Sequence, residues 1–91
     1  MISATVIGLV SDTCHECHDL RENLKRMFAE RKIELEFVEV SYDDDPNGSM
    51  ESVSDFGMTE VPSFYVGGVV FTKYTSSSDL EKAVKAIQSD A

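Results

Sequence analysis

The segment Thr13-Cys14-His15-Glu16-Cys17-His18 contains both cysteines and both histidines of this 91-residue chain. Thr13 followed three residues later by Glu16 is typical of a capping box, which starts a helix. Cys14 would then occupy the first helical position, where unpaired amide groups and the helix dipole favour a thiolate over a thiol. Cys17 would lie one turn further along, on the same side. The segment therefore predicts two cysteines that close and reopen a small disulfide.

The composition predicts one soluble domain spanning residues 1–91. With 42% hydrophobic residues the chain can bury one compact core, but it is too short for two domains. No apolar run approaches the roughly 18 residues of a membrane helix, and the segment Met1-Ile2-Ser3-Ala4 lacks the features of a signal peptide. A net charge of −9 disfavours nucleic acid and anionic membranes as partners. We therefore expect a cytoplasmic monomer that binds neither.

Hydrophobic periodicity predicts a βαβ unit in the first half of the chain. The apolar run from Thr5 to Val10 is too short for a helix and indicates a central strand buried on both faces. A helix from Cys14 to about Arg31 follows, with an apolar stripe that includes Cys17. The alternating segment from Ile33 to Val40 is typical of an edge strand. Cys17 is therefore expected on the core side of the helix, with Cys14 at its exposed rim.

A short second helix is expected over about Ser49 to Phe56. Gly57 stands where a left-handed C-cap residue belongs. Asp45 before Pro46 offers an earlier start, although the residues after Pro46 weaken it.

The last third of the chain predicts a hairpin and a helix. Two β-rich runs, Ser63 to Val66 and Val69 to Lys73, are separated by the two-residue hairpin signal Gly67-Gly68. Ser78 and Glu81 form a second capping box, which opens the final helix. The complete order of elements is β-α-β-α-β-β-α.

This order, with a Cys-x-x-Cys pair at the first strand-to-helix junction, resembles the thioredoxin superfamily, and most closely its small glutaredoxin-like members. The resemblance covers nearly the whole chain and depends most on Cys14-His15-Glu16-Cys17 and on Phe56-Gly57-Met58-Thr59-Glu60-Val61-Pro62. It implies an α/β fold whose four-stranded mixed sheet carries helices on both faces. It also implies a thiol-disulfide oxidoreductase that reduces protein disulfides by dithiol exchange.

The resemblance implies a role for each matching residue. Cys14 would be the catalytic nucleophile, and Cys17 would resolve the mixed disulfide that Cys14 forms with a substrate. Pro62 matches the cis-proline of the family, which leaves the backbone of Val61 free to pair with an extended substrate. The alternatives without a functional role are that both cysteines are buried and inert, and that Pro62 is a trans proline at the start of an edge strand.

The residues around Cys14 depart from the family pattern. Glutaredoxins usually carry Pro and an aromatic residue between the cysteines, where this chain has His15 and Glu16. A protonated His15 would stabilise the thiolate and make the disulfide more oxidising. The predicted substrate-binding residues are Thr13, His15, Val61, Pro62 and Asp79.

The chain matches the glutathione-binding residues of the family only in part. In the family a basic residue before the cysteine pair, the backbone before the cis-proline and an acidic residue near the last helix hold glutathione. Val61 and Asp79 match the last two, but Ser11-Asp12-Thr13 supplies no basic residue, and Lys73 could replace it only if the hairpin brings it near. We therefore expect no resident cofactor and a donor of the thioredoxin-reductase type rather than glutathione. Ribonucleotide reductase is one client class that the resemblance allows.

Two readings from other classes use the same motif. Cys14-x-x-Cys17-His18 matches the attachment signature for c-type haem, although the buried strand before it argues against haem. Cys14, Cys17 and His18 could also supply three ligands of a metal or iron-sulfur carrier, with a fourth from elsewhere. The preferred interpretation, a thiol-disulfide oxidoreductase, includes no metal site. Metal analysis with thiol counting separates it from the metal carrier.

Overall fold

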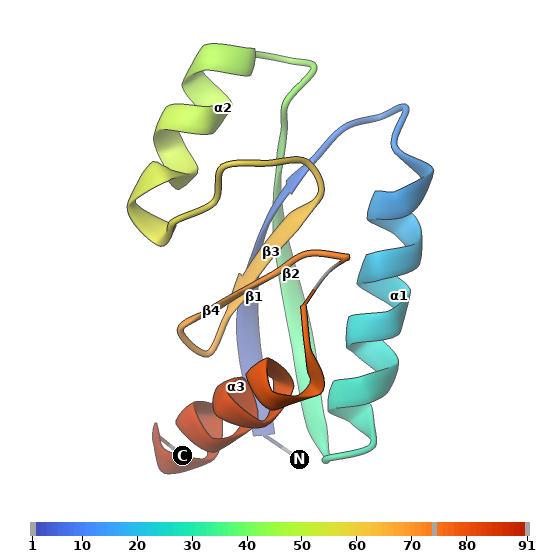
Figure 1. Ribbon diagram of the computed structural model, residues 1–91, viewed down its shortest axis with the longest axis vertical. Coiled ribbons are helices and arrows are strands. Elements are labelled where there is room, and N and C mark those ends of the chain that lie inside the picture. Colours follow the sequence, from blue (N-terminus) through green and yellow to red (C-terminus); the bar gives the residue numbers. More distant parts are fainter. Residues whose placement is uncertain (1, 74, 91) are drawn as a thin grey trace.

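The computed structural model describes residues 2–73 and 75–90. Along this part of the chain lie β1 (Ile2–Val10), α1 (His15–Ala29), β2 (Ile33–Ser41), α2 (Pro46–Val53), the 3-10 turn η1 (Ser54–Phe56), β3 (Ser63–Val66), β4 (Val69–Phe71) and α3 (Ser77–Asp90). The described residues form a small α/β domain with a four-stranded mixed sheet and three α-helices (Figure 1).

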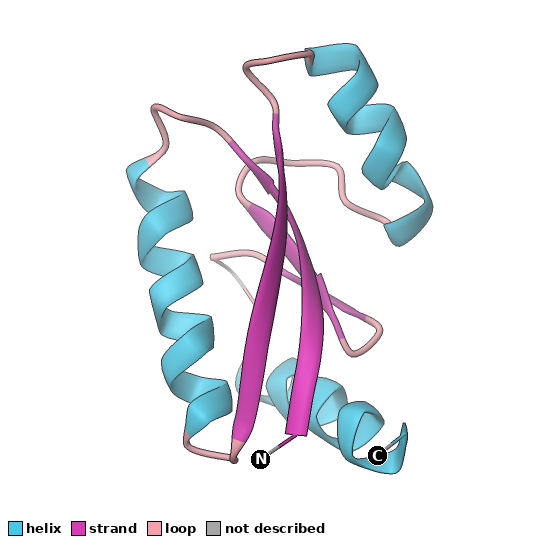
Figure 2. Cartoon of the chain, turned by 180° about the vertical axis from the view of Figure 1, so that it is seen from behind, coloured by secondary structure: helices cyan, strands magenta, loops and turns pink. Residues whose placement is uncertain are grey.

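The strands are ordered β2-β1-β3-β4 in the sheet. β1 and β2 are parallel and pair from Ile2 with Ile33 to Val10 with Ser41, and Figure 2 shows these two long strands side by side. β3 runs antiparallel to β1, and β4 antiparallel to β3. The prediction of a central first strand and an edge second strand is therefore confirmed.

Two hydrophobic cores lie on opposite faces of the sheet, because successive side chains of β1 point to opposite sides. On one face Val6 packs in a cluster with residues of α1 and α3, among them Phe28 and Val84. On the other face Leu9 packs with Val53 of α2 and with Met58. Accordingly, α1 and α2 lie on opposite sides of the strands (Figure 1).

Gly8 of β1 gives space to the ring of Phe64, which belongs to the neighbouring strand β3. A Cβ atom at Gly8 would lie 2.6 Å from Cε1 of Phe64, which leaves no room for a larger residue. The Phe64 ring is fully buried and makes an edge-to-face contact with Phe37 of β2, with ring centroids 5.7 Å apart. Three strands therefore meet through one aromatic side chain.

The predicted start of the second helix was wrong. The helix begins at Pro46, because the Asp45 carboxylate caps it by accepting from the backbone N–H of Gly48 at 3.1 Å. Ser49, the expected start, is buried within the helix, and its hydroxyl donates to the carbonyl of Ser41. Gly57 does adopt the predicted left-handed conformation after η1, with φ of 80°.

The capping box predicted for the last helix was also displaced. α3 begins at Ser77, and the backbone N–H of Ser76 donates to the carboxylate of Asp79 at 3.4 Å. Glu81 is not available for capping because its carboxylate pairs with Arg31 at 2.9 Å. A run of three serines offered several equivalent starts, and the contact between Ser76 and Asp79 distinguishes one of them.

The hairpin glycines provide a test of how closely β3 and β4 approach α3. Gly67 and Gly68 both have positive φ, but a Cβ at Gly67 would lie 2.6 Å from the carbonyl oxygen of Ala83, whereas a Cβ at Gly68 would meet nothing within 4 Å. We expect Gly68→Ala to lower the free energy of unfolding by about 1 kcal/mol through backbone strain alone, and Gly67→Ala by about 2 to 4 kcal/mol. Urea denaturation of both variants measures the difference. Equal losses would contradict the close approach.

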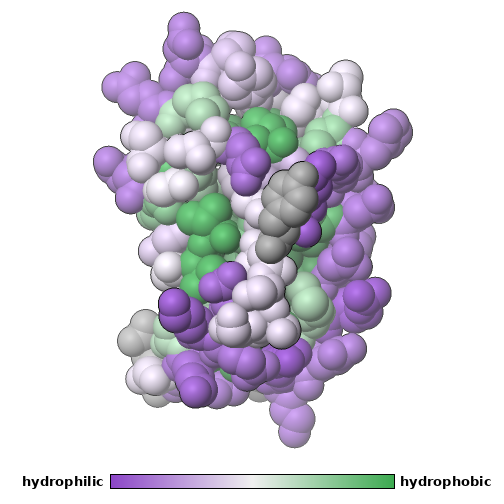
Figure 3. Space-filling model, in the orientation of Figure 1, coloured by the Kyte–Doolittle hydropathy of each residue, from purple (hydrophilic) through white to green (hydrophobic). Residues whose placement is uncertain are grey.

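Hydrophilic residues cover most of the surface in Figure 3, and hydrophobic residues appear in a band between α2 and α3. Among the described residues, no helix has both the length and the apolar character needed to cross a membrane.

Candidate active site

Cys14 and Cys17 form a disulfide at the N-terminus of α1, with their Cα atoms 5.3 Å apart. Cys14 is the N-cap residue, and its Sγ accepts a hydrogen bond from the backbone N–H of Cys17 at 3.0 Å. The predicted capping box of Thr13 and Glu16 was therefore wrong, and so was the placement of Cys14 at the first helical position. The reason is that the sulfur of Cys14 itself accepts from the first turn, so the helix begins one residue later, at His15.

The two sulfurs differ in exposure. Cys17 is only 6% exposed and faces the core, whereas Cys14 is half-buried at the rim. This difference was predicted from the apolar stripe of the helix. An incoming molecule therefore reaches Cys14 first.

The loop that presents Cys14 is held by Asp43, which follows β2. The Asp43 carboxylate accepts from the hydroxyl of Ser11 at 2.9 Å and from the backbone N–H of Asp12 at 2.8 Å. The backbone N–H of Cys14 in turn donates to the carbonyl of Ser11 at 3.1 Å. Sequence reasoning missed Asp43, whose only signal was its position in the acidic turn after the second strand.

A groove of about 510 Å³, here called the Val61 groove, opens beside Cys14. It brings Cys14 together with Val61, as predicted, although these residues are far apart in the sequence. The peptide bond between Val61 and the buried Pro62 is cis, which agrees with the expectation from the family resemblance. The groove is lined by Ser11, Cys14, Tyr42, Asp43, Met50, Thr59, Glu60 and Val61.

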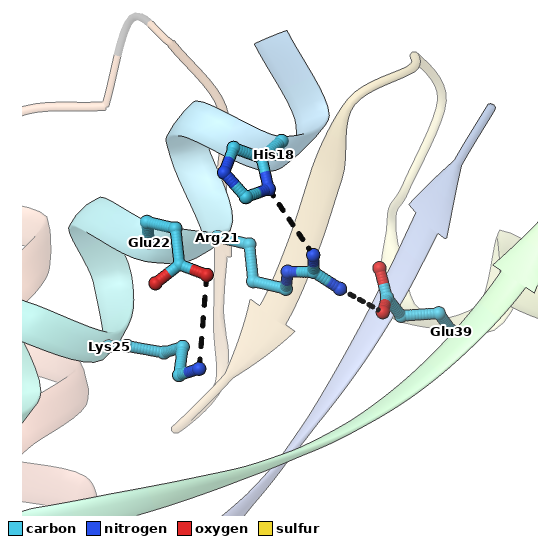
Figure 4. Close-up of polar contacts among 5 residues, drawn as sticks. All are labelled: His18, Arg21, Glu22, Lys25 and Glu39. Atoms are coloured by element: carbon cyan, nitrogen blue, oxygen red, sulfur yellow. Dashed lines mark hydrogen bonds and ion pairs between the residues drawn. The ribbon is translucent and has the colours of Figure 1, made fainter. Parts of the chain in front are cut away.

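A second groove of about 390 Å³, here called the Arg21 groove, lies on the β2 side of the disulfide and includes both cysteines. Arg21 pairs with the carboxylate of Glu39 at 2.8 Å and lies 3.4 Å from Nδ1 of His18 (Figure 4). Sequence reasoning missed Arg21, although its spacing from Cys14 and Cys17 places all three on one helix face. The site therefore contains a basic residue, but this residue is already paired.

The other predicted substrate-binding residues lie outside both grooves. Thr13 and His15 are exposed, and the hydroxyl of Thr13 lies 3.3 Å from that of Ser11. Asp79 is half-buried at the start of α3, where its carboxylate accepts from the hydroxyl and the backbone N–H of Ser76. The structure therefore brings Val61 to Cys14 but does not gather Thr13, His15 and Asp79 into one cavity with them, and the buried Pro62 lines neither groove.

Lys73 does reach the cysteine motif. Its Nζ lies 3.5 Å from the carboxylate of Glu16, which stands between His15 and Cys17 in the sequence. Lys73 is therefore near the predicted position of a basic residue, but its ammonium group already lies beside an acidic side chain.

In residues 2–73 and 75–90, no three or more His, Cys, Asp and Glu side chains are arranged to hold a metal ion. Cys14, Cys17 and His18, the ligands considered for a metal carrier, thus form no such group. In the described state the two sulfurs are bonded to each other.

Comparisons with known proteins add little to this geometry. No family model matches the chain, and no curated protein matches it. Among solved structures, one described as a malarial protein superposes with a TM-score of 0.47 at 16% sequence identity, over 93% of this chain and 97% of that chain. The chemistry of the site must therefore be inferred from its own residues.

Proposed function

We propose that this chain is a small thiol-disulfide oxidoreductase with a thioredoxin-like fold of the glutaredoxin type. The observation that carries the proposal is the disulfide at the N-terminus of α1, whose more exposed sulfur, Cys14, faces a groove shared with Val61. The strand order β2-β1-β3-β4, with the cysteine pair directly after the central strand, supports the fold assignment. The cis bond before Pro62 is a further point of agreement.

The proposed reaction is a two-step exchange in which the client disulfide is reduced. The Cys14 thiolate attacks one client sulfur, which forms a Cys14–client disulfide and releases the other client sulfur as a thiolate that takes up a proton. Cys17 then loses its proton and attacks the sulfur of Cys14, which forms the internal disulfide and releases the second client thiol. The client gains two electrons and two protons, and the protein dithiol loses them.

The geometry suits this division of roles. Cys14 lines the Val61 groove, whereas Cys17 does not line it and is only 6% exposed. The backbone N–H of Cys17 lies 3.0 Å from Sγ of Cys14, and a charge-assisted hydrogen bond at this position would stabilise a thiolate in the reduced protein.

The charges near the disulfide favour a dithiol flavoprotein of the thioredoxin-reductase type over glutathione as electron donor. Glutathione is an anionic peptide, and the two basic residues near the motif, Arg21 and Lys73, are each paired with a carboxylate. Protein disulfides in the cytoplasm are the proposed clients, and ribonucleotide reductase is one class among them.

Insulin reduction tests the function itself. With dithiothreitol as donor, the protein should accelerate precipitation of the insulin B chain well above the rate with dithiothreitol alone.

A comparison of electron donors uses insulin as the same client. Turnover with the flavoprotein reductase should exceed turnover with glutathione and glutathione reductase by roughly one to two decades, since a missing charge-assisted contact is worth about 1.5 to 3 kcal/mol. Equal turnover would contradict the ranking of donors but not the function.

A further inference from the structure

The Val61 groove has an uneven distribution of charge. Its lining residues include two carboxylates, from Asp43 and Glu60, and none of the lining residues that the structure describes is basic. Glu60 directly precedes Val61, and Asp43 is fixed beside the loop that carries Cys14 through its bonds to Ser11 and Asp12. Both acidic residues therefore border the surface from which a client approaches the reactive sulfur.

The opposite side of the disulfide does not balance this charge. The cation of the Arg21 groove, Arg21, is paired with Glu39 at 2.8 Å, as Figure 4 shows, and Asp12 lines the same groove. A client that brings an anionic group to Cys14 would thus meet carboxylates in one groove and an occupied cation in the other. A client that brings a cation would meet partners at the mouth of the Val61 groove.

We propose that the Val61 groove selects protein disulfides flanked by lysine or arginine, with Glu60 and Asp43 as the residues that determine this specificity. The inference depends on the proposed function and narrows its client class. Attraction between a client cation and these carboxylates at several ångströms, partly screened by water, corresponds to roughly a threefold gain in rate for each charge.

A series of three small disulfides that share a two-carbon spacer isolates the effect of charge. Cystamine is cationic, hydroxyethyl disulfide is neutral and dithiodipropionate is anionic. Because their leaving thiols differ in pKa, each rate is divided by the rate of the same disulfide with free dithiothreitol. We expect the normalised rates to fall in this order, with cystamine about tenfold above hydroxyethyl disulfide.

Two variants separate the groove from the overall negative charge. Glu60→Gln should lower the ratio of cystamine to hydroxyethyl disulfide about threefold. Glu34→Gln removes the same charge from an exposed residue at the start of β2, paired with Ser3 far from the disulfide along the strands, and should leave the ratio unchanged. The ratio should also approach one in about 1 M salt, where the Debye length is about 3 Å.

A ratio near one for the unaltered protein, or equal losses in the Glu60 and Glu34 variants, would overturn this inference while turnover of hydroxyethyl disulfide still upheld the proposed function. A failure to reduce the neutral disulfide through Cys14 would instead overturn the proposed function, and the client preference with it.

Discussion

Replacing Cys14 by serine is expected to lower the rate of insulin reduction on the order of a thousandfold or more, to the level of dithiothreitol alone. Serine keeps the size of the side chain but replaces a thiolate with a hydroxyl that stays protonated at neutral pH. The more exposed sulfur, which lines the Val61 groove, is then gone, and the buried Cys17 does not line this groove. The insulin assay with purified variant measures the loss.

The Cys17→Ser variant is the matched control for this result, because it removes the other sulfur. It should still react once with a client and then remain attached to it, since nothing resolves the mixed disulfide. Mass spectrometry of the intact protein after incubation with a disulfide-containing peptide detects this adduct. Accumulation of the adduct in Cys14→Ser rather than Cys17→Ser would show that the roles are reversed, and full activity of Cys14→Ser would refute the mechanism.

Replacing Phe64 by alanine is expected to lower the free energy of unfolding by about 3 to 5 kcal/mol. The ring is fully buried, lies against the backbone of Gly8 and contacts Phe37 edge to face. Its removal leaves a cavity where three strands meet, and rigid sheet backbone on several sides limits collapse into it. Since a domain of this size has a free energy of unfolding of only about 5 to 15 kcal/mol, the variant should lose a large share of it and unfold at a much lower urea concentration.

Urea denaturation followed by circular dichroism measures this change, and Val38→Ala is the control. Val38 also lies in the sheet, but its side chain is 55% exposed on the edge strand β2. Truncation there should change the free energy of unfolding by less than about 0.5 kcal/mol. A loss at Phe64 as small as that at Val38 would contradict its place at the centre of the fold.

The arrangement of strands could be predicted because hydrophobic periodicity is a local signal that burial reinforces. The continuous apolar run ending at Val10 identified the central strand, and the alternation after Ile33 identified the edge strand. Gly67-Gly68 marked the hairpin, since both residues need positive φ. In each case, the residues that carry the signal also make the contacts that fix the element.

Helix starts could not be predicted, because neighbouring residues offered competing caps within a few positions of one another, as with Asp45 and Ser49. Charge pairs could not be predicted, because they join residues distant in sequence. The spacing of Glu81 from Ser78 predicted a capping residue, but the fold places Arg31 beside Glu81, and the two side chains form an ion pair. Likewise, the pairing of Arg21 with Glu39 joins α1 to β2. The sequence could locate the cysteine pair, since its spacing is local, but not the charges that surround it.

Asp43 has a consequence for how this site can vary in length. It bonds to Ser11 and Asp12 across 32 and 31 positions of the chain, and so ties the junction after β1 to the junction after β2. An insertion or deletion in either junction would separate these partners and release the loop that presents Cys14. The lengths of the two junctions, residues 11–14 and 41–45, are therefore expected to be constrained together. Transplanting the cysteine motif into another scaffold requires both segments, and loop-length changes are better tolerated elsewhere in the chain.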